Sequence, residues 1–131
     1  MDTLEEKHDH QPLDFPDGFL WGTSTSAHQV EGNNVNSDWW DFELNKQPPK
    51  KRSGLACNKN QLFESDFALL KSLNQNAHRL SLEWARIEPT EGRFDFSEIE
   101  HYRAVLKSLK DKNIAIMLTL WDFTLPKLVA D

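Results

Sequence analysis

A short stretch of the chain, residues 79–84, alternates polar and apolar side chains with the period of a β-strand. Arg79, Ser81 and Glu83 fall on one face of that strand. The arginine cannot lose its charge by deprotonation, so among apolar neighbours it requires a carboxylate or a ligand oxygen as partner. Two interpretations stay open: the polar face points into a site in a parallel sheet, or it is a solvated strand edge with a surface salt bridge.

Polar side chains also follow two other segments of strand-like composition, residues 19–27 and 114–120. In a parallel sheet the carboxyl ends of the strands lie at one edge, where active sites form. The polar residues at or just beyond the three ends are Gln29, Glu31, Glu83, Arg86, Trp121 and Asp122. We therefore expect a functional site at this edge.

Helical signals separate the strands. A short helix capped by Asp38 precedes the loop around Pro48 and Pro49. Asn58 with Gln61 is expected to start the first of two longer helices, and Asn74 to end it. The capping box Ser97 with Glu100 is expected to start the second, and Asn113 to end it.

The order strand, helix, strand, helix, strand predicts an α/β fold with a parallel sheet and right-handed crossovers. Residues 114–120 are almost continuously apolar, which predicts a third strand buried on both faces. A doubly wound fold and a barrel both fit this order. No glycine-rich phosphate loop follows residues 19–27, which disfavours a nucleotide-binding version of the doubly wound fold.

Composition limits the partners of the chain. It has 131 residues, of which 38% are hydrophobic and 27% charged, as in a globular domain. A net charge of -6 argues against nucleic acid. Five tryptophans and eight phenylalanines could provide flat platforms for sugar rings, although core packing is the commoner use of aromatic residues. Cysteine and histidine spacing shows no metal site, and we expect no cofactor.

The start of the chain bears on its location. Residues 1–16 lack the basic and apolar regions of a signal peptide, and Cys57 has no cysteine to pair with, so a reducing cytoplasmic environment is expected. The longest apolar run, residues 114–121, is too short to cross a bilayer, so no membrane partner is expected.

Two long segments resemble glycoside hydrolase family 1, the β-glucosidase and β-galactosidase family. Residues 15–32, FPDGFLWGTSTSAHQVEG, closely resemble its amino-terminal signature, and residues 76–89, NAHRLSLEWARIEP, resemble its second barrel strand. Weaker similarity covers nearly all of residues 15–131. The resemblance implies a (β/α)₈ TIM barrel that hydrolyses β-glycosides with retention through two glutamates on the fourth and seventh strands. Both of those motifs would follow Asp131.

The resemblance assigns roles to a few residues. Gln29 matches the glutamine that binds the glycone, and Arg79 matches the arginine beside the nucleophilic glutamate, whose ionised state it would support. Trp121 and Asp122 are expected to contact substrate. Trp84 is interpreted as a core residue on the outward face of the strand. Glu31, Glu83 and Asp122 lie where the family has no catalytic carboxylate, so no catalytic residue is expected within the chain.

The chain departs from the family pattern at two places. Asp122 stands where the family has a histidine that hydrogen-bonds the glycone, and an ionised aspartate can only accept hydrogen bonds. Residues 58–60, Asn-Lys-Asn, replace the family's Asp-His-Tyr. Altered glycone preference and lost activity are both open.

We therefore expect a flexible acidic tail over residues 1–14 and, over residues 15–131, the first three β/α units of a barrel that takes about 250 residues. The expected function is the amino-terminal portion of a β-glycosidase acting on β-glycosides or oligosaccharides, inactive by itself. A non-catalytic carbohydrate-binding or scaffold remnant and an unrelated α/β protein are the alternatives. Open strand edges predict that the isolated chain is marginally stable, aggregation-prone or oligomeric.

Overall fold

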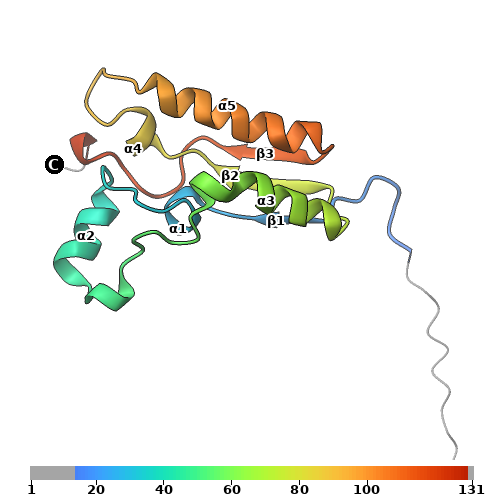
Figure 1. Ribbon diagram of the computed structural model, residues 1–131, viewed down its shortest axis with the longest axis horizontal. Coiled ribbons are helices and arrows are strands. Elements are labelled where there is room, and N and C mark those ends of the chain that lie inside the picture. The colour runs from blue at the N-terminus through green and yellow to red at the C-terminus, as the bar shows by residue number, and fades with distance from the viewer. Residues whose placement is uncertain (1–13, 130–131) are drawn as a thin grey trace, which may run out of the picture.

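The computed structural model describes residues 14–129, so the predicted acidic tail lies outside the described residues except for Asp14. Three parallel strands form one sheet in the order β1-β2-β3: β1 (Gly22–Ser24), β2 (Ala77–Ser81) and β3 (Ala115–Thr119). The long helices α3 (Lys59–Ser72) and α5 (Phe96–Asp111) precede β2 and β3 (Figure 1). The shorter elements are α1 (Ala27–Val30), α2 (Asp38–Lys46), η1 (Pro49–Lys51), α4 (Trp84–Ile87) and η2 (Lys127–Val129). The predicted order of strands and helices is confirmed.

The first two strands are shorter than the sequence suggests. Ahead of β1, the rings of Phe15, Phe19 and Trp21 pack on one another with centroids 4.5 to 4.9 Å apart, in place of further strand pairing. β2 ends at Ser81. Trp84 is the first residue of α4, and its indole Nε1 donates to Glu88 Oε2 at 2.8 Å. The interpretation of Trp84 as an outward strand residue is therefore wrong, because the chain turns into a helix before it.

The helix ends follow local hydrogen-bond chemistry. Asn74 and Asn113 adopt the predicted left-handed conformation, with φ of 56° and 55°. The predicted start of α3 at Asn58 is confirmed, although the Asn58 side chain makes no capping hydrogen bond. The other two predicted start signals are wrong: Asp95 caps α5 by accepting from the backbone N–H of Ser97 and Glu98, and Ser37 caps α2. In each corrected case the capping oxygen belongs to the residue immediately before the helix. No helix within residues 14–129 is long and apolar enough to span a membrane.

The core lies between one face of the sheet and the two long helices. It is formed by Phe67 of α3, Leu80 of β2, Val105 and Leu109 of α5, and Ile114 ahead of β3. Parallel register places Ser24, Arg79 and Met117 opposite one another. Because side chains alternate along a strand, this row lies on the sheet face opposite Leu80 and the core.

The prediction that β3 is buried on both faces is wrong. Met117, in the row with Arg79, is 64% exposed, and Ile116 on the other face is 38% exposed. The reason is that α3 and α5 pack on one face only, while no described element covers the Met117 face or pairs with the outer edge of β3. The continuously apolar sequence of β3 therefore meets solvent.

We expect the 131-residue chain to self-associate at micromolar concentrations, because an apolar edge strand offers both hydrogen bonds and apolar surface to another chain. Sedimentation velocity would measure this. Met117→Lys places a charge on the open face and should shift the protein toward monomer, whereas Leu69→Lys, on an exposed position of α3, should not. A clean wild-type monomer that unfolds cooperatively would contradict the expectation.

Candidate active-site cleft

A cleft of about 410 Å³ opens beyond the carboxyl ends of the strands, a volume within the range of about 300–1,000 Å³ that is typical of small-molecule sites. Its lining residues are Ser26, His28, Gln29, Trp39, Arg79, Asp122, Phe123 and Thr124. The structure thus brings together Gln29, Arg79 and Asp122, which come from three separate segments. Their contact with a ligand stays a prediction.

Arg79 reaches from β2 across to β3. Its Nε donates to Thr119 Oγ1 at 2.9 Å, and its Nη2 lies 3.0 Å from Asp122 Oδ2. Because Asp122 Oδ2 accepts no aligned hydrogen bond from the described residues, the contact is chiefly electrostatic. The two side chains are 30% and 26% exposed. β2 is the central strand, so the interpretation of its polar face as a solvated strand edge is wrong.

Gln29 is placed by the short helix α1. The backbone N–H of Ala27, the first residue of α1, donates to Ser81 Oγ at 2.7 Å, which ties the helix to the end of β2. Ala27 is buried while Gln29 stays exposed in the cleft. The side-chain amide of Gln29 is therefore available both to donate and to accept hydrogen bonds.

His28 was not among the predicted site residues, yet it lines the cleft from a buried position. Its Nδ1 lies 3.1 Å from Asn34 Nδ2 and its Nε2 lies 3.2 Å from Glu43 Oε1. Because the amide nitrogen of Asn34 can only donate, His28 Nδ1 accepts a hydrogen bond from it. His28 Nε2 therefore carries the ring proton and donates a hydrogen bond to Glu43. Burial raises the pKa of Glu43, but hydrogen bonds from Ser53 and His28 outweigh it and lower the pKa overall. The only sequence signal for His28 is its place next to Gln29.

Two aromatic side chains form one wall of the cleft. The rings of Trp39 and Phe123 meet edge to face with centroids 5.0 Å apart. Phe123 has a φ of 73°, an uncommon backbone conformation for a bulky residue. Trp121, the predicted aromatic contact, is not a lining residue, and its Nε1 donates to the backbone carbonyl of Thr124 at 3.0 Å. Phe123 thus lines the cleft and Trp121 does not. The left-handed backbone at Phe123 lies between these outcomes, and no sequence pattern indicates it.

Glu31 and Glu83 lie behind the cleft rather than in it. The Tyr102 hydroxyl donates to Glu31 at 2.9 Å and Arg86 Nε donates to it at 3.0 Å. Burial raises the pKa of Glu31, against the effects of Arg86 and Tyr102. Within residues 14–129, no cluster of three or more His, Cys, Asp or Glu side chains could hold a metal ion.

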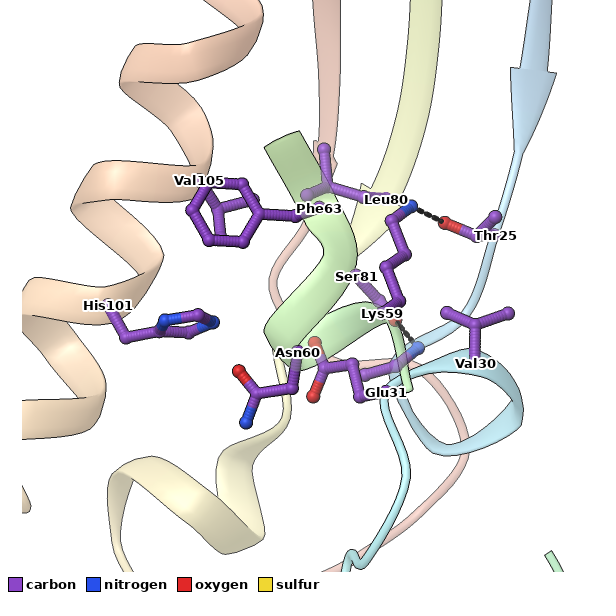
Figure 2. A pocket seen from close by; sticks show the side chains of 11 residues that line it. Thr25, Val30, Glu31, Lys59, Asn60, Phe63, Leu80, Ser81, His101 and Val105 are labelled. Carbon is purple, nitrogen blue, oxygen red and sulfur yellow. Dashed lines mark hydrogen bonds between the residues drawn. The ribbon is translucent and has the colours of Figure 1, made fainter. Parts of the chain in front are cut away.

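A second, much smaller cavity of about 20 Å³ lies between the sheet and the helices. Figure 2 shows Lys59 extending along it toward Thr25, with Glu31 and His101 on its other sides. Lys59 Nζ lies 2.9 Å from both Thr25 Oγ1 and His78 Nε2. Burial, and then the charge of Lys59, lower the pKa of His78 to about 4. Burial also lowers the pKa of Lys59, so both members of this pair are shifted toward their neutral forms.

Comparison with known proteins gives one consistent family. The family model described as Glycosyl hydrolase family 1 matches residues 11–131. Beta-glucosidase 12 of Arabidopsis thaliana is 30% identical over 99% of this chain and 29% of its own length. A 1,4-beta-D-glucan glucohydrolase of Thermotoga neapolitana is 29% identical over 86% of this chain and 28% of its own length. The chain thus spans less than a third of these relatives.

Solved structures agree with the fold. The beta-glycosidase from Pyrococcus horikoshii superposes with a TM-score of 0.85 and 42% identity, over 92% of this chain and 28% of that one. A beta-glucosidase from Thermotoga maritima, in complex with castanospermine, superposes with a TM-score of 0.81 and 28% identity, over 88% of this chain and 28% of that one. These neighbours are TIM barrels, so the three-stranded sheet is the amino-terminal section of a barrel and not half of a doubly wound sheet.

The Lys59 and His78 pair predicts acid sensitivity. In the folded chain the pKa of His78, about 4, lies below the ordinary histidine pKa of 6.5, so folding stability should be lost as pH falls from about 6.5 toward 4. His78→Gln keeps an acceptor for Lys59 but cannot titrate. It should reduce the loss of unfolding free energy over this pH range by up to about 3 kcal/mol. Urea unfolding across this pH range would measure it.

Lys59→Met is the companion variant, because it removes one cause of the lowered pKa of His78 and should also make the curve flatter. Equal pH slopes in the wild type and in His78→Gln would show that His78 does not govern this acid sensitivity.

Proposed function

Because the chain belongs to glycosyl hydrolase family 1, we propose that it supplies the glycone side of the active site of a retaining β-glycosidase. The observation that carries the proposal is the meeting of Gln29, Arg79 and Asp122 in one cleft. A retaining mechanism needs two carboxyl groups about 5–5.5 Å apart, one as acid and one as nucleophile. We infer that these come from the part of the barrel that follows the third strand.

Each of the three residues has a defined chemical task in this proposal. Gln29 would hydrogen-bond the glycone through its amide, which can pair with any orientation of a sugar hydroxyl. Arg79 would stabilise the negative charge of the nucleophilic glutamate and keep it ionised. Asp122 would accept hydrogen bonds from sugar hydroxyls at the position of the family's histidine. The substrate class is a β-glucoside, a β-galactoside or a related oligosaccharide.

Asp122 changes the electrostatics of the site. Its carboxylate already pairs with the guanidinium of Arg79 at 3.0 Å. A nucleophilic glutamate placed beside Arg79 would share that positive charge, and Asp122 would add a second negative charge that raises the pKa of its neighbours. We infer that this site works with a weaker stabilisation of its nucleophile than a site with a neutral histidine.

A chimaera can test the proposal. The 92% of this chain that superposes at 42% identity on the beta-glycosidase from Pyrococcus horikoshii would replace the corresponding 28% of that enzyme. We expect the chimaera to hydrolyse 4-nitrophenyl β-glucoside. Arg79→Gln should lower kcat by roughly 100- to 1,000-fold, the usual cost of removing one such electrostatic group.

Arg103→Gln is the matched control, because Arg103 is exposed on α5 and should leave the rate unchanged. A folded chimaera that binds glucose saturably without hydrolysis would instead favour a carbohydrate-binding remnant. An unchanged rate in Arg79→Gln would contradict the role of Arg79.

Asp122→His in the same chimaera tests the replaced position. The change removes the carboxylate next to Arg79 and restores a side chain that can both donate to and accept from a sugar hydroxyl. We expect a kcat/KM for β-glucoside that rises by about 10-fold, the worth of about one good hydrogen bond, together with a changed ratio of glucoside to galactoside hydrolysis. If rate and preference both stay the same, Asp122 does not contact the sugar.

A further inference from the structure

The segment after β3, residues 121–126, carries part of the cleft in a conformation that needs outside support. Phe123 combines a φ of 73° with 70% exposure of the residue, so its own packing does not hold it. A bulky residue keeps such a backbone only where its surroundings fix it. The segment also carries Asp122 and Thr124, which line the cleft.

Hydrogen bonds within the segment and to α2 supply part of this support. The N–H of Thr124 donates to the carbonyl of Asp122 at 2.9 Å, and the N–H of Leu125 donates to Asp38 Oδ1 at 2.9 Å. These contacts fix the backbone on each side of Phe123 and Thr124. The segment is joined to β2 on the cleft side by the ion pair of Asp122 with Arg79.

Glu83 makes a second, buried connection from beneath the cleft. The Thr124 hydroxyl lies 2.9 Å from Glu83 Oε2 and 3.1 Å from Oε1, and both residues are buried. Glu83 follows β2 directly and is fixed from behind: its side chain accepts from the N–H of Ala85 at 3.3 Å and its N–H donates to the Tyr102 hydroxyl at 3.1 Å. The end of β2 thus holds Thr124 through a carboxylate that has no access to the cleft.

We propose that Glu83 is a positioning residue whose carboxylate, through Thr124, holds the segment that carries Asp122 and Phe123 in the conformation that lines the cleft. The importance of this segment for sugar recognition rests on the function proposed above. The contact itself is a property of the chain and can be tested without a ligand.

The charge of Glu83 decides how strong the contact is. An ionised carboxylate only accepts hydrogen bonds, so it matches the two donors around it, the Thr124 hydroxyl and the Ala85 N–H. A protonated carboxyl carries a donor hydrogen of its own and matches these two donors less well. Burial raises the pKa of Glu83 to about 7, opposed by hydrogen bonds from Thr124 and Ala85. The charged and titratable groups that face it are Glu31, Arg86 on α4 and Tyr102 on α5. The segment is therefore held more firmly above neutral pH than below it.

NMR of the 131-residue chain carrying Met117→Lys, which should keep it monomeric, tests the proposal between pH 5.5 and 8.5. The amide resonances of Asp122, Phe123 and Thr124 should shift with one common midpoint near 7, and the carboxyl carbon of Glu83 should titrate with them. Glu83→Gln should abolish this step. Thr124→Val should move the midpoint of Glu83 upward and uncouple the Phe123 amide from it, and Thr124→Ser should restore both.

Glu91→Gln is the matched control, because Glu91 is an exposed glutamate shortly after α4 and its replacement should leave the midpoint in place. The proposal would be overturned if the amide resonances of residues 121–126 showed no titration step in this pH range, or if that titration step survived Glu83→Gln. The chimaera separates this proposal from the proposed function. A folded chimaera that does not hydrolyse β-glucoside, while residues 121–126 of the chain still respond to the titration of Glu83, defeats the function and leaves the positioning role intact.

Discussion

The permanent charge of Arg79 is the constraint around which the cleft is arranged. A guanidinium on the central strand of a sheet cannot be neutralised by losing a proton, so the chain must provide anionic or oxygen partners close to it. Thr119 on β3 and Asp122 just beyond it provide them. This requirement joins the ends of β2 and β3 and leaves the α1 side of the cleft, with Gln29, to uncharged hydrogen bonding.

The buried carboxylates behind the cleft follow a different rule. Glu43 and Glu83 are held mainly by hydroxyl and backbone N–H donors, and Glu31 has one arginine as well as Tyr102. Neutral donors can satisfy a buried acid without a full opposite charge, but they leave its protonation sensitive to burial. The polar layer under the cleft is therefore well connected and at the same time responsive to pH.

Much of this architecture can be predicted from local sequence, and the exceptions have physical causes. Periodicity and the left-handed asparagines at 74 and 113 give the element order correctly. Gln29 and Asp122 could be placed together because parallel strands end at one edge, and Arg79 could be placed from its position on the polar face of its strand. Trp39, Phe123 and the buried role of His28 could not, since they depend on a left-handed backbone and on contacts between distant segments. The solvent exposure of β3 could not be predicted either, because an apolar run predicts burial but does not tell whether the covering elements are present.

The free edge of β3 carries structural information of its own. Ala115 donates its N–H to Asn76 on the β2 side at 2.7 Å. Because successive N–H groups of a strand point in opposite directions, Met117 also turns toward β2, while the N–H groups of Ile116 and Leu118 face outward. A fourth parallel strand must take its hydrogen bonds at these two residues. Directly opposed residues in such a pair share a face, so the residue aligned with Met117 would extend the row that contains Arg79. The edge thus selects which alternate side chains of its neighbour would enter the interior of the barrel.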